Sequence, residues 1–185
     1  DENQVVLPKV KPQPKAVSQP TIWADIRGNN PKTYLGIDGL FNGTNPQSGI
    51  EYIYTNESDL TLKTKARSIE KLQIATVYAY KGSSKIIEKN AYFIGILSTS
   101  KQFEFVKKTP LTIQIGNQQT AAKPLMRFYA DSDKFMQELL VYQVDAATLE
   151  KLHKAENVSL KLGTIGLTVN THSKTLISKL MKVTN

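Results

Sequence analysis

The chain of 185 residues contains no cysteine. This absence excludes disulfide bonds, thiolate nucleophiles, zinc sites with cysteine ligands and iron–sulfur clusters. A cytosolic protein of this length usually carries one or two cysteines, whereas many exported bacterial proteins carry none. The sequence begins with Asp1 rather than methionine, which either a removed signal peptide or the choice of starting residue would explain. We therefore expect a bacterial protein exported to the periplasm or the cell surface.

Histidine is nearly as scarce, since the chain has only His153 and His172. Neither has a His or Glu four residues away, which is the spacing of a metal-binding pair on a helix. The run Asp131-Ser132-Asp133 resembles the beginning of a calcium loop, but the Glu required at position 12 would fall on Tyr142. The sequence therefore predicts no metal site and no cofactor.

Catalytic motifs are also missing. Without cysteine or a positioned histidine, a nucleophile and base would have to be a carboxylate pair or a Ser–Lys pair. Asp38 with Glu51 is one candidate pair, and Ser83-Ser84-Lys85 contains the other. Asp38 precedes Gly39 in a typical turn dipeptide, and the Ser–Lys run also follows a glycine turn. We assign no catalytic residue, and an enzyme is the less favoured interpretation.

The chain has little arginine for its positive charge. The net charge is +8 and the sequence pI is near 9.5, yet only three of the 24 basic residues are arginine. Arginine makes most of the bidentate contacts to phosphate and guanine, and the lysines here are spread along the chain. This pattern indicates a solvated surface rather than a specific nucleic-acid site. Weak attraction to anionic polymers stays open.

No apolar run approaches the roughly 20 residues that a membrane-spanning helix needs. We therefore predict no transmembrane segment, and the length suits one domain with a substantial core. Residues 1–21 hold four of the eight prolines and no aromatic residue, which predicts an extended arm or tether. Residues 22–185 are predicted to form a single β-rich α+β domain.

Alternation of apolar and polar residues predicts many short strands. They are expected over residues 33–37, 50–54, 60–64, 72–80, 86–87, 92–98, 102–105, 111–115, 119–123 and 126–130. Residues 134–144 favour a strand over a helix from 133 to 140.

The last forty residues change from strand to helix periodicity and back. Asp145 is predicted to cap a helix that ends near residue 155, and Ser173 to cap a final helix. Strands over 158–162 and 165–169 are expected between them, separated at Gly163. The predicted fold is α+β, a mostly antiparallel curved sheet or β-sandwich with two C-terminal helices packed on it.

Tyrosine is the most abundant aromatic residue, with eight copies. Tyr52 with Tyr54, and Tyr78 with Tyr80, are two residues apart, so the members of each pair point to the same face of a strand. If the two strands are neighbours, the four rings could form an exposed stacking surface for sugars or an extended peptide. The alternative is that they are cross-strand pairs that stabilise the sheet.

The C-terminal segment from Asp145 to Ala155, followed by residues 158–163, is similar to the end of uncharacterised β-rich domains of bacterial exported proteins. The resemblance covers about the last 75 residues, and its motifs are structural. It implies an antiparallel sheet packed by C-terminal helices. It implies no catalytic or binding residue.

The leading functional hypothesis is an exported bacterial binding or accessory domain that is not an enzyme. A hydrolase-like enzyme acting on a cell-envelope polymer is the second hypothesis, and a structural assembly subunit is the third. Candidate partners are a cell-envelope polymer or another exported protein. The sequence does not choose between them.

Overall fold

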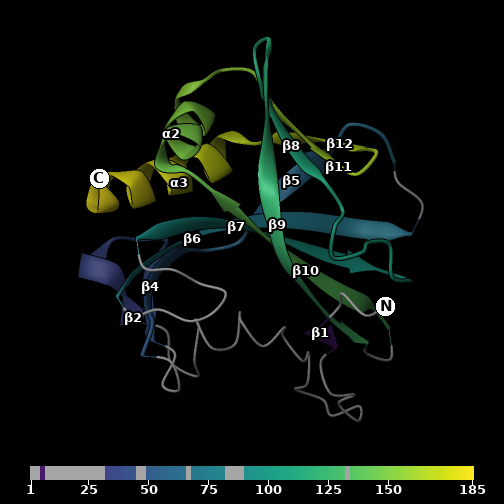
Figure 1. Ribbon diagram of the computed structural model, residues 1–185, viewed down its shortest axis with the longest axis horizontal. Helices are drawn as coiled ribbons and strands as arrows, with labels where there is room; N and C mark the ends of the chain where they lie inside the picture. The colour runs from purple at the N-terminus through teal and green to yellow at the C-terminus, as the bar shows by residue number, and fades with distance from the viewer. Residues whose placement is uncertain (1–4, 7–31, 45–48, 66–67, 82–89, 132–133) are drawn as a thin grey trace.

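A computed structural model describes residues 5–6, 32–44, 49–65, 68–81, 90–131 and 134–185 (Figure 1). Within these residues the chain forms twelve strands, two α-helices and a short 3-10 helix. The strands are β1 (Val5–Val6), β2 (Lys32–Thr33), β3 (Leu40–Thr44), β4 (Glu51–Thr55), β5 (Ser58–Leu62), β6 (Ile69–Lys81), β7 (Ala91–Ser100), β8 (Leu111–Ile115), β9 (Gln118–Asp131), β10 (Met136–Val144), β11 (Val158–Leu162) and β12 (Ile165–Val169). The helices are the 3-10 helix Tyr34–Gly36, α2 (Ala146–Lys154) and α3 (Thr171–Thr184).

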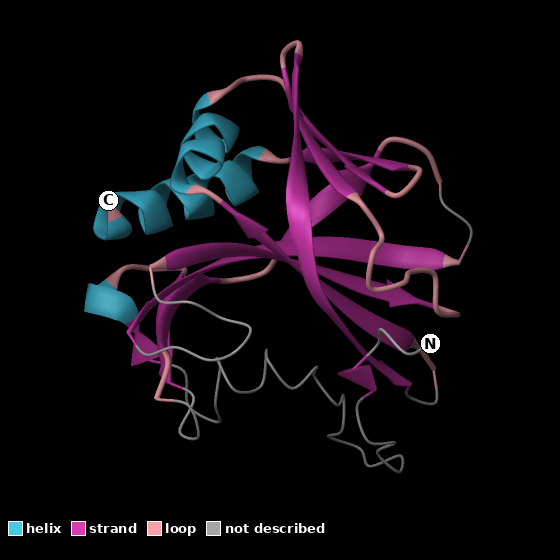
Figure 2. Ribbon diagram, viewed as in Figure 1, coloured by secondary structure: helices cyan, strands magenta, loops and turns pink. Residues whose placement is uncertain are grey.

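Eight of the strands close into an antiparallel barrel, in the order β6-β5-β12-β11-β8-β9-β10-β7 and back to β6. Strand β6 pairs with β5 along one edge and with β7 along the other, which closes the ring. The predicted α+β class with a mostly antiparallel sheet and two C-terminal helices is confirmed at this level. The finer prediction of an open curved sheet or a sandwich is wrong, because the sheet is a closed barrel (Figure 2).

Strand β6 is long enough to pair with two consecutive strands along one edge. Its residues opposite β4 include Tyr78, and its residues opposite β5 include Leu72. Residues 56–57 connect those two strands, and the N–H of Asn56 donates to the carbonyl of Gly39 at 3.0 Å. Strand β4 belongs to a side sheet outside the barrel, in which β3 pairs with β4 and β2 pairs with β3.

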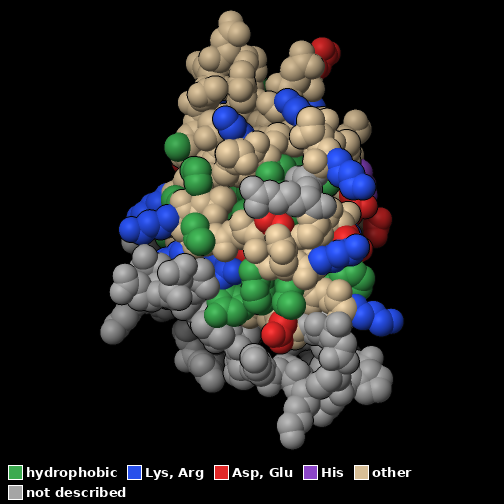
Figure 3. Space-filling model, turned by 90° about the vertical axis from the view of Figure 1, so that its right-hand side faces the viewer, with side chains coloured by type: hydrophobic (Ala, Val, Ile, Leu, Met, Phe, Trp, Pro, Cys, Tyr) green, Lys and Arg blue, Asp and Glu red, His purple; other side chains and the backbone are tan. Residues whose placement is uncertain are grey.

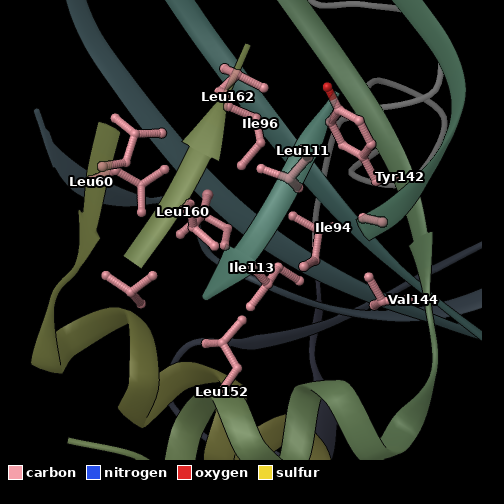
Figure 4. Packing of buried hydrophobic residues seen from close by; sticks show 14 of the residues in the cluster. Leu60, Ile94, Ile96, Leu111, Ile113, Tyr142, Val144, Leu152, Leu160 and Leu162 are labelled. Atoms are coloured by element: carbon pink, nitrogen blue, oxygen red, sulfur yellow. The ribbon is translucent and has the colours of Figure 1, made fainter. Parts of the chain in front are cut away.

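The barrel interior is filled by side chains rather than hollow (Figure 4). Residues at every second position of the barrel strands point inward, as the pleat of a strand requires. Leu149 and Leu152 of α2 and Ile177 and Met181 of α3 belong to the same apolar cluster, so the helices close one end of the barrel. The inward-facing strand residues include Leu60, Leu72, Ile74, Ile94, Ile96, Leu111, Ile113, Leu140, Tyr142, Leu160, Leu162 and Leu167.

The two helices begin and end largely as expected, with one difference. Asp145 caps α2 by accepting the N–H of Thr148 at 2.8 Å, which confirms the predicted cap. The predicted cap at Ser173 is wrong, because α3 begins at Thr171 with Asn170 at the N-cap. Ser173 is instead buried inside the helix, with its hydroxyl 2.6 Å from that of Ser58.

Several strand predictions differ from the structure. Residues 102–105 are not a strand but part of the loop between β7 and β8, in which Phe105 is buried and Phe103 is partly exposed. Only the first residue of the predicted strand at 33–37 belongs to a strand, since a 3-10 helix begins at Tyr34. The strand predicted over 134–144 rather than a helix is confirmed as β10. The strand predicted at 86–87 lies outside the described residues.

The N-terminal segment contributes one short strand to the sheet. Val5–Val6 pair in parallel with β9, opposite Phe128 and Tyr129. This pairing uses a stretch of β9 that β8 does not reach, because β8 pairs only with residues 118–122. The predicted boundary at residue 22 and the rest of the predicted arm lie outside the described residues. Among the residues that the structure describes, no helix is long and apolar enough to cross a membrane.

Candidate functional site

The four tyrosines proposed as a stacking surface do not share one face. In the pairing of β4 with β6, Tyr52 lies opposite Ala79 and Tyr54 opposite Val77, so Tyr78 faces the same side as Ile53. Tyr52 and Tyr54 are 2% and 1% exposed. The prediction of one exposed platform is wrong, because the register places the two pairs on opposite faces.

Tyr78 and Tyr80 instead belong to a partly buried aromatic cluster against α3. Their rings stack with centroids 6.5 Å apart, and Tyr78 also lies 4.6 Å from the ring of Tyr92. The Tyr80 hydroxyl is 3.0 Å from the side-chain amide of Asn42, which donates to it. The Tyr92 hydroxyl donates to Thr184 of α3 at 2.7 Å. These rings therefore serve mainly to hold α3 against the sheet.

A groove of about 440 Å³ lies where β9 separates from β10, beside the beginning of α2. One wall is the part of β9 that contains Thr120 and Ala121, and the opposite wall includes Ala146 and Thr148 of α2. The beginning of β7 also lines it, through Tyr92. We call this space the β9–α2 groove. Its remaining lining residues are Asn90, Ala91, Lys123, Gln143, Val144 and Asp145.

The titratable side chains of the β9–α2 groove are largely engaged in holding the structure. The Asp145 carboxylate accepts the N–H and the hydroxyl of Thr148, and these bonds lower the pKa of Asp145 below its ordinary value. Burial raises the pKa of the Tyr92 hydroxyl, which is already a donor to Thr184. Among the described lining residues, Lys123 is the one cationic side chain. The remaining lining groups are hydroxyls, amides and small apolar side chains, which suit hydrogen bonding and close approach rather than proton transfer.

A second groove of about 420 Å³ lies beyond the other side of β8, next to the turn between β8 and β9. Gln114, Asn117, Asn157, Ser159 and Thr168 contribute its polar groups. Asn117 and Gly116 form the turn, and Gln119 donates to the side chain of Gln114 at 3.3 Å. Lys63 and Glu156 are the charged side chains among its described lining residues.

The barrel contains a buried ion pair that the sequence pattern did not predict. Arg127 of β9 and Glu138 of β10 are 2% and 0% exposed, and Nη2 of the guanidinium lies 2.8 Å from the carboxylate. The Arg127 Nε donates to the same oxygen at 3.0 Å, and the guanidinium lies 4.3 Å from the ring centre of Tyr129. Alternation in Met126–Ala130 would have placed Arg127 toward solvent, but the barrel places that face inside.

Glu138 fastens the loop that covers this end of the barrel. Its carboxylate accepts the backbone N–H of Glu104 at 2.6 Å and that of Phe105 at 3.0 Å. Burial raises the pKa of the Glu138 carboxyl above its ordinary value, outweighing the opposing effect of these N–H groups and of Arg127. Loop residues 101–110 therefore close the end opposite to the helices, and the pair has a structural role.

The other residues singled out in the sequence are not brought together. Asp38 precedes β3, whereas Glu51 pairs with Thr44 at the far end of that strand. His153 is 3.2 Å from Glu150 one helical turn earlier, and His172 is exposed in the first turn of α3. No group of three potential metal ligands occurs among the described residues. Asp131-Ser132-Asp133 and Ser83-Ser84-Lys85 lie wholly or partly outside those residues.

The lysines do not converge on either groove. On the face shown in Figure 3, Lys and Arg side chains are spread over several places. Two lysines of α3 hold the helix in place: Lys174 donates to the carbonyl oxygens of Ala155 and Glu156, both at 2.8 Å, and Lys179 to that of Asp38 at 2.9 Å. Comparison with protein-family models, with curated proteins and with solved structures finds no match.

Proposed function

We propose that this chain is a binding or accessory domain of an exported bacterial protein, and that it is not an enzyme. The binding site would be the β9–α2 groove, and the partner a cell-envelope polymer or another exported protein.

The observation that carries this proposal is the chemistry of the groove lining. Thr120, Gln143 and Asn90 present hydroxyl and amide groups, while Ala121 and Ala146 leave room for a ligand to approach the backbone. Specific recognition needs a concave site with a few convergent polar groups, which this groove provides. The barrel interior is packed with apolar side chains, so a ligand would have to bind on the outside.

Two probes test the proposal: purified peptidoglycan sacculi, in a sedimentation assay, and a random heptapeptide display library. The variant Ala121→Trp fills the β9–α2 groove, and Gln114→Trp adds the same side chain to the second groove as a matched control. We expect at least one probe to bind the wild-type chain and the control but not Ala121→Trp. Binding of neither probe would contradict the proposal.

The same samples separate the alternative functions. Time-dependent release of reducing sugar ends or free amino groups from the sacculi would favour the hydrolase-like enzyme. Self-association that rises with protein concentration in light scattering, and that Ala121→Trp does not change, would favour the structural assembly subunit. Saturable binding without release of either product is the result that the proposal requires.

A further inference from the structure

Along the wall of the β9–α2 groove, one edge of strand β9 has no partner among the described strands. Its residues 118–122 pair with β8 on one side, and the pairing with β10 on the other side begins only at Lys123, opposite Gln143. After Val144 the chain leaves the sheet and enters α2, capped by Asp145. Within the part of the chain that the structure describes, no strand continues the line of β10 beyond this point.

The hydrogen-bond pattern of the hairpin shows which peptide groups point into the groove. Gly163 donates to the carbonyl of Pro110, so the even-numbered residues of β8 bond to β11 and the odd-numbered ones to β9. In an antiparallel ladder only alternate pairs exchange hydrogen bonds. The N–H and C=O groups of Gln119 and Ala121 therefore point away from β8, toward the space that β10 would otherwise occupy.

Nothing in the sequence of this edge opposes strand addition. Proteins usually protect free strand edges with lysine, proline or a bulge, but residues 118–122 are neutral and contain neither lysine nor proline. Thr120 and Ala121 are exposed. Another free stretch of the same strand already takes an added strand, since Val5–Val6 pair with Phe128 and Tyr129.

From these observations we propose that the β9–α2 groove binds an extended peptide segment of another protein, which pairs with β9 through the backbone of Gln119 and Ala121. The peptide would continue the line of β10, so it has the geometry of a short added strand. A single strand suits the site better than the edge of a second copy, because α2 and β7 bound the groove on the far side. The small residues Ala121 and Ala146 favour a peptide with small or polar side chains. This inference rests on the proposed function and makes its partner a polypeptide.

The test uses heptapeptides selected from the display library on the wild-type chain. Ala121→Pro removes the outward N–H while leaving the bonds to β8 in place, because proline is tolerated at the open side of an edge strand. Ala121→Val keeps that N–H and serves as the matched control. We expect Ala121→Pro to weaken binding of a selected peptide about tenfold or more, and Ala121→Val to change it less than about threefold.

Two further measurements distinguish strand pairing from other binding at the groove. N-methylation of successive peptide amides should abolish binding at every second position, since only alternate amides face β9. Hydrogen exchange of the Gln119 and Ala121 amides should slow on binding, whereas that of Thr120, already bonded to β8, should not change.

The outcomes separate this inference from the proposed function. If selected peptides lose binding with Ala121→Trp but bind Ala121→Pro normally and show no alternation, strand pairing is wrong and the binding function stands. Binding of sacculi but of no peptide would likewise contradict strand pairing and leave the proposed binding function in place. If the wild-type chain instead self-associates and Ala121→Pro prevents this, the occupant is a second copy and the peptide proposal is overturned.

Discussion

The buried pair of Arg127 and Glu138 gives the most stringent test of how the barrel is held together. Both side chains lie inside the barrel, and the carboxylate also accepts two backbone N–H groups from the loop 101–110. Replacing Arg127 by Met leaves a buried carboxylate without its cation. Replacing Glu138 by Gln leaves a buried guanidinium without its anion and weakens the attachment of the loop.

The expected losses in the free energy of unfolding follow from the cost of burying a charge without its partner. Each single variant should lose about 3–5 kcal/mol of the free energy of unfolding. The double variant Arg127→Met/Glu138→Gln has no buried charge, and the Gln oxygen still accepts from one loop N–H. It should lose only about 1–3 kcal/mol, which is less than the sum of the two single losses. The coupling between the two sites should therefore be several kcal/mol.

Urea denaturation followed by circular dichroism measures these free energies, and hydrogen exchange at the amides of Glu104 and Phe105 reports on the loop. Glu138→Gln should speed exchange at both amides more than Arg127→Met does, because only the first change weakens the acceptor. The control is Lys154→Gln, because this lysine side chain is 71% exposed in its pair with Glu150 and its loss should leave the free energy of unfolding nearly unchanged. Additive losses within about 0.5 kcal/mol in the double variant would refute the reasoning.

The pair also predicts a dependence on pH. Because burial raises the pKa of Glu138, the folded protein binds the proton more tightly than the unfolded chain does. The contribution of this group to stability should therefore fall as pH rises from the ordinary value of 4.5 through the folded pKa. Subtracting the pH profile of Glu138→Gln from that of the wild-type chain isolates this slope, and a slope of the opposite sign would contradict the direction.

Three smaller predictions concern a helix cap, a glycine and a leucine of α2 in the barrel core. In urea titrations, Asp145→Ala should lower the free energy of unfolding by about 1 kcal/mol at neutral pH. Because the folded pKa of Asp145 is lowered, this advantage of the wild-type chain should disappear as pH falls through that folded pKa. Asp145→Asn should keep the cap without this dependence on acid. Gly39→Ala should cost about 2 kcal/mol or more by the same measurement, because φ is +88° and a Cβ would lie 2.5 Å from Leu176, whereas Gly116→Ala, at φ +59° in open space, should cost less. Leu152→Ala, in α2 at the helix-covered end of the barrel, should lower the free energy of unfolding by about 2–5 kcal/mol without changing binding at the β9–α2 groove.

Local patterns were enough to predict most strands but not how they close. The alternation in residues 111–115, 158–162 and 165–169 predicts β8, β11 and β12, because a strand with one face in a core has period two. Closure depends on pairs far apart in the chain, such as Leu60 of β5 with Val169 of β12. No local period contains that information, so an open sheet and a barrel look alike in the sequence.

The tyrosine prediction failed for a related reason. The spacing of Tyr52 and Tyr54 correctly places both on one face of β4, and the two strands are neighbours as supposed. What the spacing does not give is the register between β4 and β6. A change of one residue in register moves every side chain of a strand to the other face, and here it places Tyr78 opposite Ile53 rather than opposite a tyrosine.

The free edge of β9 does have a signal in the sequence, although its meaning appears only with the fold. Pro124 lies opposite Tyr142, and the register between β9 and β10 shifts at that point, with Leu125 as the additional residue on β9. Proline within a sheet is confined to edges and bulges because it has no N–H to donate, and a bulge bends and twists its strand. The pairing with β10 ends one residue beyond Pro124, at Lys123, and residues 118–122 pair only with β8 among the described strands. The ladder continues for two pairs beyond this bulge and ends where Asp145 caps α2, and among the described residues no strand then bonds to the outward N–H and C=O groups of Gln119 and Ala121.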